Sequence, residues 1–306
     1  MTLQQLIYVV EAADNESINK AAEKLFVSQP SISEAIKDLE EELGMQIFNR
    51  TNRGITVTAQ GDEFLGYARQ MIEFHNMICE RYTDEKTGKK HFSVSSQHYS
   101  FAVEAFIHTV QEFGMDEYEF AMHETKTGEV IENVKTLKSE LGILYMNDFN
   151  RDALNKIFKR DQIEFTPLFD CNICVFLANE NPLSKKKKIK IEELYDYPCI
   201  SFEQGKDNSF YFAEEVLSTN DYKRVIKVDD RSTGLNLMKG LNAFTLCSGI
   251  LCEELNGDGY SAVPLDTNDT MTVGYIRLAK VPLSDIAGQY IEKLKKYENK
   301  VIKVKK

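Results

Sequence analysis

The sequence predicts an α/β chain: an N-terminal winged helix-turn-helix, a long linker helix and a C-terminal α/β domain. Three observations predict this class. Three short helical patterns and a hairpin pattern fill the first 58 residues, an uninterrupted helical pattern follows, and apolar runs then alternate with amphipathic helices. With 306 residues the chain is also long enough for two or three domains.

Composition narrows the class of protein. The chain is 42% hydrophobic and 28% charged, without low-complexity tracts, as in globular proteins. It contains no run of about 18 apolar residues, and its start lacks the basic and apolar regions of a signal peptide. We therefore expect a cytoplasmic protein with no disulfides among its six cysteines. The net charge of −11 repels nucleic acid overall, so any DNA contact must be local.

The first two helices are short. The first carries an apolar face and ends near Asn15; the face consists of Leu3, Leu6, Ile7, Val10 and Ala13. Ser17 is placed to cap a second helix over residues 18–26. Its small residues Ala21 and Ala22 suit close helix packing, so the two helices are expected to lie together.

The third helix has the features of a recognition helix. Ser28 is placed to cap it, Pro30 falls in its first turn, and Gly44 is placed to end it. Its buried stripe is Ile32, Ile36, Leu39 and Leu43. The opposite face carries short and medium polar side chains that can reach base edges and phosphates in a major groove. The alternative is a solvated face on a purely structural unit of three helices.

A hairpin with a polar tip follows over residues 47–57 and predicts a wing. Arg50 and Arg53, the only arginines among the first 66 residues, both lie on it. This placement suits contacts with phosphates or the minor groove. The candidate DNA-binding residues are therefore Ser28, Gln29, Pro30, Ser31, Ser33, Glu34, Lys37, Arg50 and Arg53.

The segment AAEKLFVSQPSISEAIKDLEEELGMQIFNRTNRGITVTAQG resembles the N-terminal pattern of the LysR family of bacterial transcription regulators almost position by position. The shared positions are Ala21, Ala22, Leu25, Ser28, Gln29, Pro30, Ser33, Leu39, Glu40, Leu43, Gly44, Phe48, Arg50, Thr58 and Gly61. Glu34 departs from the pattern, because many relatives carry a basic or neutral residue there. The operator sequence therefore cannot be transferred from the family.

A connecting helix over residues 60–82 shows an apolar repeat at alternating steps of four and three. The repeat comprises Phe64, Ala68, Met71, His75, Ile78 and Tyr82. A single helix cannot bury such a seam on itself, so we expect a homodimer, which the LysR resemblance also implies, and pairing of dimers into a tetramer is open. His75 is interpreted as a packing residue rather than a ligand. Residues 84–90 read as a hinge.

The rest of the chain alternates between strand and helix patterns, which predicts a largely parallel sheet. Strands are expected at residues 91–96, 118–123, 141–146, 199–202, 225–228 and 271–278, and within the apolar run 165–177. Helices are expected at residues 101–113, 130–137, 191–195, 210–217, 235–239 and 284–297. The LysR resemblance implies a periplasmic-binding-protein-like pair of lobes with a ligand between them.

The domain boundaries follow from these patterns. The winged helix-turn-helix covers residues 1–58, the linker helix and hinge 59–88, and the effector-binding domain 89–306. Within that domain we expect lobe I to comprise residues 89–164 and 269–306, and lobe II residues 165–268.

Ligands of open α/β sheets bind at the carboxyl ends of strands, near helix N-termini. Residues 95–100 and 231–234 have this setting and are rich in hydroxyl groups, although either block could simply cap its helix. The candidate effector-binding residues are Ser95, Ser96, Gln97, His98, Tyr99, Glu124, Tyr145, Gln204, Thr233 and Thr245. For His98, a bond to an anionic effector and a bond to the backbone are equally open.

The segments HFSVSSQHYSF, SELGILYMN and VDDRSTGLNLM resemble a Gram-positive LysR subgroup associated with cysteine, methionine and sulfur metabolism. This resemblance implies an effector related to amino acids, such as O-acetylserine.

Other functions find less support. Cys171 and Cys174 form a C-x-x-C motif inside a strand-like run, where residues three apart point to opposite faces, so we expect no metal or redox site. Ser96 and His98 with Asp170 or Glu124 could be combined into a catalytic set. However, no nucleophile elbow, phosphate loop or zinc motif accompanies them, so we expect no enzyme and no cofactor.

The predicted function is a sequence-specific transcription regulator, modulated by a small metabolite held between the lobes. Its expected partners are a pseudo-palindromic site in double-stranded DNA, a small effector and a second copy of the chain. RNA polymerase is a further candidate partner, and no membrane is involved. The alternative is a DNA-binding regulator whose C-terminal domain docks a protein and takes no ligand.

Overall fold

A computed structural model describes residues 1–51, 54–82, 90–113, 117–205 and 210–302. The chain divides into two compact units, Met1–Gly88 and Lys89–Lys306, and each is described by itself. In these described ranges, no helix is long and apolar enough to cross a membrane.

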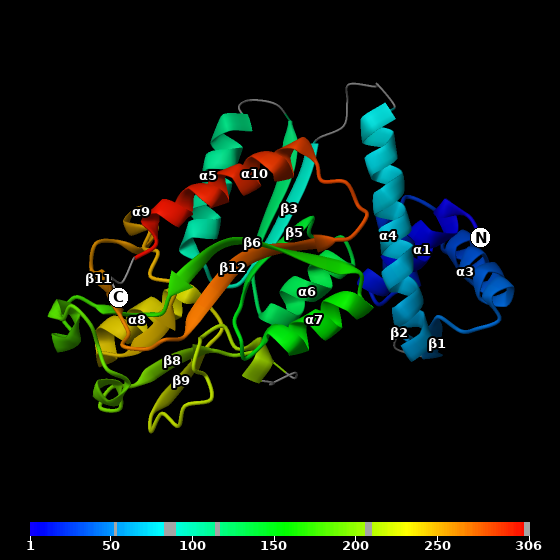
Figure 1. Ribbon diagram of the computed structural model, residues 1–306. Helices are drawn as coiled ribbons and strands as arrows, with labels where there is room; N and C mark the ends of the chain where they lie inside the picture. Colours follow the sequence, from blue (N-terminus) through cyan, green and yellow to red (C-terminus); the bar gives the residue numbers. More distant parts are fainter. Residues whose placement is uncertain (52–53, 83–89, 114–116, 206–209, 303–306) are drawn as a thin grey trace. The chain divides into compact units, whose positions relative to one another are not determined.

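The first unit is a winged helix-turn-helix followed by a long helix (Figure 1). Its elements are α1 (Leu3–Asp14), α2 (Ile18–Lys24), α3 (Gln29–Leu43), β1 (Phe48–Thr51), β2 (Gly54–Val57) and α4 (Ala59–Tyr82). β1 and β2 pair antiparallel, with Phe48 opposite Val57, as the hairpin pattern predicts. The expected second helix is shorter than predicted, because Leu25 already caps its C-terminus.

The helix ends follow the capping residues in the sequence. The Ser17 and Ser28 hydroxyls accept hydrogen bonds from the backbone N–H groups of Lys20 and Ser31. Gly44 ends α3 in the left-handed conformation, with φ of 65°. These three predictions are confirmed.

A buried carboxylate ties the wing to α3. Glu40 is only 5% exposed, and its Oε1 accepts hydrogen bonds from the backbone N–H groups of Ile47 (2.7 Å) and Phe48 (3.0 Å). Ile47 and Phe48 also belong to the apolar core that joins α1, α2 and α3. The wing is therefore held by backbone hydrogen bonds as well as by packing.

The predicted seam of α4 divides into two parts. Ala68 is 1% exposed and Phe64 packs against the core of this unit, so these two positions are used internally. Among the described side chains of α4, the exposed large apolar ones are Tyr67, Met71, Phe74 and Ile78, so the stripe keeps Met71 and Ile78 of the predicted seam and has Tyr67 and Phe74 in place of Ala68 and His75. Steps of four, three and four place them on one helix face. The seam assigned to Phe64 and Ala68 is therefore corrected to this stripe.

The first sheet of the second unit has the strand order β4-β3-β5-β12-β6. Its strands are β3 (Lys90–Ser96), β4 (Tyr118–Glu124), β5 (Leu141–Met146), β6 (Ile163–Asn172) and β12 (Thr270–Leu278). Helices α5 (Ser100–Phe113) and α10 (Asp285–Lys295) lie together on one face, and α6 (Thr127–Lys135) and α7 (Arg151–Arg160) on the other (Figure 1).

The second sheet has the order β11-β7-β10-β8-β9. Its strands are β7 (Cys174–Ala178), β8 (Cys199–Phe202), β9 (Val225–Val228), β10 (Phe244–Cys247) and β11 (Tyr260–Pro264). Helix α8 (Arg231–Leu241) packs on β7 and β9, and the four-residue helix α9 (Glu253–Asn256) lies against α5.

Both sheets are mixed, so the expectation of a largely parallel sheet is corrected. In the first, β12 runs antiparallel to β5 and β6; in the second, β7 runs antiparallel to β10 and β11. The chain passes from the first sheet to the second at Ile173, directly before β7. It returns to the first sheet between β11 and β12. A strand that enters from the other lobe needs no helical crossover, so it is free to run antiparallel.

Three expectations need correction. The lobe boundary expected at residues 164/165 falls inside β6, which pairs with β12 in the first sheet up to Asn172. The helix expected over residues 210–217 is only a 3-10 turn, Phe210–Phe212. Residues 191–195 likewise form a 3-10 turn, Ile191–Leu194, rather than an α-helix. The sequence reading also missed α7, β10 and β11.

Candidate functional site

The polar face of α3 is open to solvent. Ser28, Gln29, Pro30, Ser31, Glu34 and Lys37 are all exposed, and Ser33 is half-buried. The Gln29 amide donates to the Ser33 hydroxyl at 2.6 Å. Lys37 pairs with Glu41 on the next turn at 3.5 Å, with both side chains more than 60% exposed. These side chains are free to change partners when a duplex approaches.

The basic wing is described only in part. Arg50 lies in β1 opposite Ile55, but its side chain is outside the described residues, as is the whole of Arg53. Their assignment to DNA contacts remains a prediction.

Sequence reasoning missed Phe26 in the turn between α2 and α3. Its side chain is 96% exposed, and its backbone adopts φ of 55°, which is uncommon for a residue with a large side chain. The residue lies two positions before Ser28, which caps α3. An apolar side chain there suits contact with a thymine methyl group.

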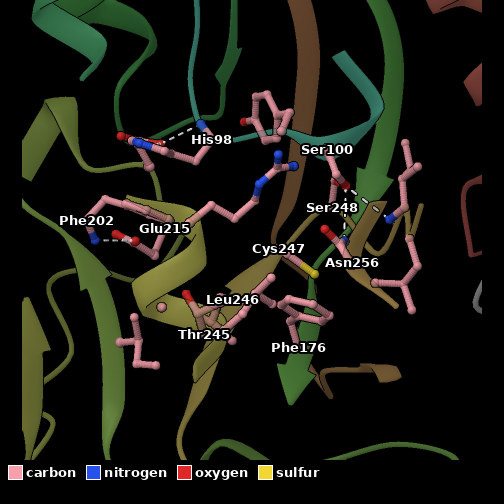
Figure 2. A pocket seen from close by; sticks show the side chains of 18 of the residues that line it. His98, Ser100, Phe176, Phe202, Glu215, Thr245, Leu246, Cys247, Ser248 and Asn256 are labelled. Carbon is pink, nitrogen blue, oxygen red and sulfur yellow. Dashed lines mark hydrogen bonds and ion pairs between the residues drawn. The ribbon is translucent and has the colours of Figure 1, made fainter. Parts of the chain in front are cut away.

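The second unit contains a pocket between its two sheets. Tyr99 and Ser100 line it from the start of α5, Arg231 from the start of α8, and Thr245 from β10. Its lining includes His98, Tyr99, Ser100, Phe176, Phe202, Glu214, Glu215, Arg231, Met238, Thr245, Leu246, Cys247, Ser248 and Asn256. In Figure 2, Ser100, Ser248 and Asn256 lie on one side of the pocket, and His98, Phe202 and Glu215 on the other. Apolar side chains complete the walls, as in most small-molecule sites.

One edge of the pocket is closed by bonds between the lobes. The Nδ1 atom of His98 lies 2.8 Å from Oε2 of Glu214, which also accepts from the His98 backbone N–H at 3.0 Å. The Gln204 amide donates to the other oxygen of Glu214 at 3.1 Å. The imidazole stacks on Phe202 with ring centroids 3.9 Å apart. We call this group, His98, Phe202, Gln204 and Glu214, the latch.

The latch continues into lobe I. The backbone N–H of Thr127 donates to Gln204 at 3.1 Å, and the Thr127 hydroxyl donates to the carbonyl of Phe212 at 2.7 Å. The Tyr145 hydroxyl donates to the carbonyl of Ala213 at 3.0 Å. These bonds hold residues 212–215 in irregular backbone, which is why no helix forms there.

Two acid–base groups beside the pocket have shifted pKa values. Burial acts to lower the pKa of His98, but the hydrogen bond and charge of Glu214 outweigh it, so the pKa is raised. Burial and the neighbouring Glu214 charge raise the pKa of Glu215 to about 7, although its carboxylate accepts from the Phe202 N–H at 2.7 Å. Both groups therefore favour their protonated forms relative to free side chains.

The predicted effector residues are only partly brought together. His98, Tyr99 and Thr245 line the pocket. Gln204 belongs to the latch, and Glu124 forms an ion pair at 3.4 Å with Arg231. The others make internal bonds or lie elsewhere: Ser95, Ser96, Gln97, Tyr145 and Thr233.

The polar block at residues 95–97 has structural uses. The Ser95 hydroxyl bonds to Ser139 at 2.8 Å, Ser96 donates to the carbonyl of Gln97, and the Gln97 amide donates to Thr127 at 2.6 Å. All three residues are at most 1% exposed. In the second block, residues 231–234, the Thr233 N–H donates to the carboxylate of Asp230, which caps α8. Thr233 therefore takes part in capping the helix, which is the alternative that the sequence left open.

The sequence reading left several pocket residues unassigned. Ser100 and Arg231 lie inside the two polar blocks but are not among the predicted effector-binding residues. Asn256, Glu214 and Glu215 are not among them either. Asn256 reaches the pocket from α9, where its amide donates to the Ser100 hydroxyl at 3.3 Å. Nothing in the local sequence indicates that residues 156 positions apart meet.

The C-x-x-C motif does not lie on one strand. Cys171 lies in β6 and Cys174 lies in β7. The pairing of β7 with β10 places Cys174 opposite Cys247. All six cysteines are free thiols, and burial raises the pKa of both Cys171 and Cys247 to about 12. Such thiols are weak nucleophiles. Among the described residues, no group of three His, Cys, Asp or Glu side chains is placed to hold a metal.

Two family models match most of the chain. The model described as "Bacterial regulatory helix-turn-helix protein, lysR family" matches residues 3–62, and the model described as "LysR substrate binding domain" matches residues 116–297. The first covers the wing and the start of α4. The second covers most of both sheets and the part of the pocket that lies after residue 116, but not His98, Tyr99 and Ser100.

Individual relatives agree with the family models. The HTH-type transcriptional regulator CysL of Bacillus subtilis is 28% identical over 224 residues, 71% of this chain and 69% of the relative. CysB of Haemophilus influenzae is 26% identical over 210 residues, 67% and 62% of the two chains.

Two solved structures share the fold. Full-length OxyR from Pseudomonas aeruginosa matches with a TM-score of 0.68 at 20% identity, covering 96% of this chain and 98% of that one. Full-length CbnR complexed with its target DNA matches with a TM-score of 0.58 at 18% identity, covering 97% and 99%. At these identities, the likeness concerns the fold alone.

Proposed function

The chain belongs to the LysR family of bacterial transcription regulators, and we propose that a small molecule bound between its two lobes controls its binding to a pseudo-palindromic DNA site. The observation that carries this proposal is the pocket between the two sheets, with unpaired polar atoms in its wall. The family consists of regulators, in agreement with the prediction that the chain is not an enzyme. The cytoplasmic location remains a prediction.

The DNA-contacting surface is the exposed face of α3 together with the wing. In this proposal α3 enters the major groove, where Gln29, Ser33 and Lys37 approach base edges and phosphates. Arg50 and Arg53 contact the backbone or the minor groove. The solved complex of CbnR with its target DNA, a protein of the same fold, supports this use of the first unit.

The exposed stripe on α4 supports a dimer. Tyr67, Met71, Phe74 and Ile78 are between 38% and 59% exposed and lie on one face. A second copy of the helix would cover them, and pairing two readers raises affinity for a two-fold symmetric site without a strongly basic surface. Whether two dimers combine into a tetramer depends on further contacts. RNA polymerase is a further candidate partner at the promoter.

Effector control requires that the ligand distinguishes two states of the protein. We propose that a ligand in the pocket changes how firmly the latch holds the two lobes together, and that this change alters the spacing of the DNA readers. The effector expected from the resemblance of three segments in the two lobes is a metabolite of sulfur amino acids, such as O-acetylserine, and the regulated genes would serve the same metabolism. A C-terminal domain that docks a protein and takes no ligand is the alternative.

A titration tests the DNA-contacting surface. The protein is titrated against a labelled fragment of its own upstream DNA and against a scrambled fragment, followed by fluorescence anisotropy. We expect specific binding. The double variant Lys37→Ala, Arg53→Ala should weaken this binding, and the slope of log affinity against log salt concentration should fall by the amount that corresponds to about two phosphate contacts. A matched variant, Lys239→Ala in the second unit, should bind as the native protein does. Unchanged affinity of the double variant would contradict the proposed surface.

A further inference from the structure

Arg231 places a partly unpaired cation in the wall of the pocket. It is the first residue of α8, and its side chain is 23% exposed. Its Nη2 atom lies 3.4 Å from the Glu124 carboxylate across the lobes. Its Nη1 atom is buried and has no hydrogen-bond partner among the described residues. A buried guanidinium N–H without an acceptor is costly, so this atom is suited to bind an oxygen of a ligand.

Two other pocket residues also have unpaired polar atoms. The hydroxyl of Thr245, a residue only 9% exposed, has no partner in the described part of the chain, and neither has Oδ1 of Asn256. The amide nitrogen of Asn256 donates to Ser100, which leaves Oδ1 as its open end. A carboxamide oxygen accepts hydrogen bonds only, so a ligand must offer it a donor.

The two carboxylates that line the pocket, Glu214 and Glu215, already accept hydrogen bonds. Glu214 accepts three hydrogen bonds within the latch, one of them from the imidazole of His98. Glu215 accepts from the Phe202 N–H and the Ser201 hydroxyl. Each oxygen of Glu214 and Glu215 therefore already accepts at least one hydrogen bond, whereas Oε1 of Glu124, the residue that pairs with Arg231, is buried and has no partner among the described residues. The unpaired groups at the pocket therefore call for one anionic end, at Arg231, and for a hydrogen-bond donor, which Oδ1 of Asn256 or Oε1 of Glu124 can accept.

The pocket is small. The cavity measures about 90 Å³. A water-sized sphere needs roughly 10–15 Å³ in this measure, so the space suits a molecule of about six to ten non-hydrogen atoms.

From these observations we infer that the effector is a small carboxylic acid that carries a hydrogen-bond donor, such as an amino or hydroxy acid. Arg231 binds its carboxylate and Asn256 accepts from its donor. Thr245 adds a hydroxyl contact. This inference rests on the proposed function and assigns the chemistry by which the site selects its ligand. Because Nη2 of Arg231 stays on Glu124, the bound carboxylate would join the ion pair that links the lobes.

The test compares acids with their own neutral derivatives. Thermal shift and calorimetry are run on the full-length protein with O-acetyl-L-serine, L-serine, L-cysteine and L-lactate, each beside its carboxamide. We expect at least one acid to raise Tm and bind, and its carboxamide to bind roughly tenfold to hundredfold more weakly, because a charge-assisted hydrogen bond is lost.

Variants assign the effect to Arg231. Arg231→Met should lose the preference for the acid over its carboxamide, while Lys239→Met, on the exposed side of the same helix, should keep it. Far-UV circular dichroism and Tm without ligand show whether Arg231→Met folds, and Arg231→Lys, which keeps a cation, should retain part of the preference if Met does not fold.

The outcomes separate this inference from the proposed function. Equal binding of an acid and its carboxamide, or an unchanged preference in Arg231→Met, overturns the inference and leaves a ligand-controlled regulator in place. Binding of none of the acids also overturns it. If, in addition, no small molecule of any charge alters DNA binding, the proposed control by a ligand fails as well.

Discussion

The Nδ1 atom of His98 lies 2.8 Å from Oε2 of Glu214, 116 positions further along the chain, and this contact joins the two lobes beside the pocket. The side chains of both residues are at most 5% exposed. Glu214 accepts the backbone N–H of His98 and the Gln204 amide as well, so one carboxylate organises the edge of the pocket. Several consequences of this arrangement can be measured.

Removal of the Glu214 carboxylate should destabilise the effector domain. Glu214→Ala removes the acceptor of the His98 backbone N–H and one of the two acceptors of the Gln204 amide, whose other acceptor is the Phe202 carbonyl at 3.4 Å, and we expect a loss of about 2–4 kcal/mol in the free energy of unfolding. Urea denaturation followed by circular dichroism measures it. The exposed neighbour Glu203 is the control, and Glu203→Ala should change the value by less than about 0.5 kcal/mol. A loss of similar size in both variants would argue against the latch.

Stability should fall as the pH rises from 5 to 8. The pKa of His98 is raised in the folded state, so its contribution is fully present below about 6.5 and is lost as the pH rises through the raised value. The pKa of Glu215 is raised from 4.5 to about 7, so between these pH values the folded state keeps a proton that the unfolded state has released. The stability that comes from protonated Glu215 is therefore lost as the pH rises from about 4.5 to 7. Both groups act in the same direction.

Glu215→Gln isolates the second contribution. The amide keeps an oxygen for the Phe202 N–H and carries no charge, so the variant should be more stable than the native protein at pH 8 by about 1–3 kcal/mol. Its dependence on pH between 5 and 8 should be flatter. Thermal melts at several pH values test this, and a variant less stable than the native protein at pH 8 would contradict the assigned pKa.

In the first unit, Glu40 should matter far more than its neighbour. Glu40→Ala removes the acceptor of two buried backbone N–H groups in the wing, and we expect a loss of about 2–4 kcal/mol together with weaker DNA binding. Glu41 is exposed and pairs only with Lys37, so Glu41→Ala should cost less than about 1 kcal/mol. Chemical denaturation of both variants distinguishes these outcomes, and equal losses would show that Glu40 does not hold the wing.

Two glycines of α4 should respond oppositely to the same substitution. A Cβ at Gly61 would lie 2.3 Å from the carbonyl oxygen of Ile47, so Gly61→Ala should destabilise the first unit by about 1–3 kcal/mol. At Gly66 nothing lies within 4 Å, so Gly66→Ala should stabilise by about 0.5–1 kcal/mol through helix propensity. The free energy of unfolding of the two variants should therefore change with opposite sign, and a change of the same sign would refute this account of Gly61.

The first unit could be predicted almost element by element, because its signals are local. A hydroxyl cap, a proline in the first turn and a terminal glycine determine where α3 begins and ends, and all three act within a few residues. The seam of α4 was harder to assign. Its periodicity indicates an apolar face, but only the packing of α1 against α4 decides that Ala68 is buried while Met71 remains exposed.

The pocket could be predicted only in part, because it is assembled from distant segments. The sequence places polar residues at the starts of α5 and α8, but it does not reveal that the hydroxyls of Ser95 and Ser96 are used internally. The contact of Asn256 with Ser100 and the bond of Glu214 to His98 join residues more than 100 positions apart. The sequence around Glu214 and Glu215 predicts a helix. Only the hydrogen bonds of this segment to distant residues explain why its backbone is irregular.

Footprinting of the purified protein on its own upstream DNA, with and without the small acids named above, tests the central claim most directly. The account predicts a protected pseudo-palindromic site whose boundaries or affinity change when one of the acids is added, and no such change in Arg231→Met. A protected site that responds to none of the acids would contradict control by a small acid bound at Arg231. Absence of protection at every salt concentration would contradict the DNA-binding function itself.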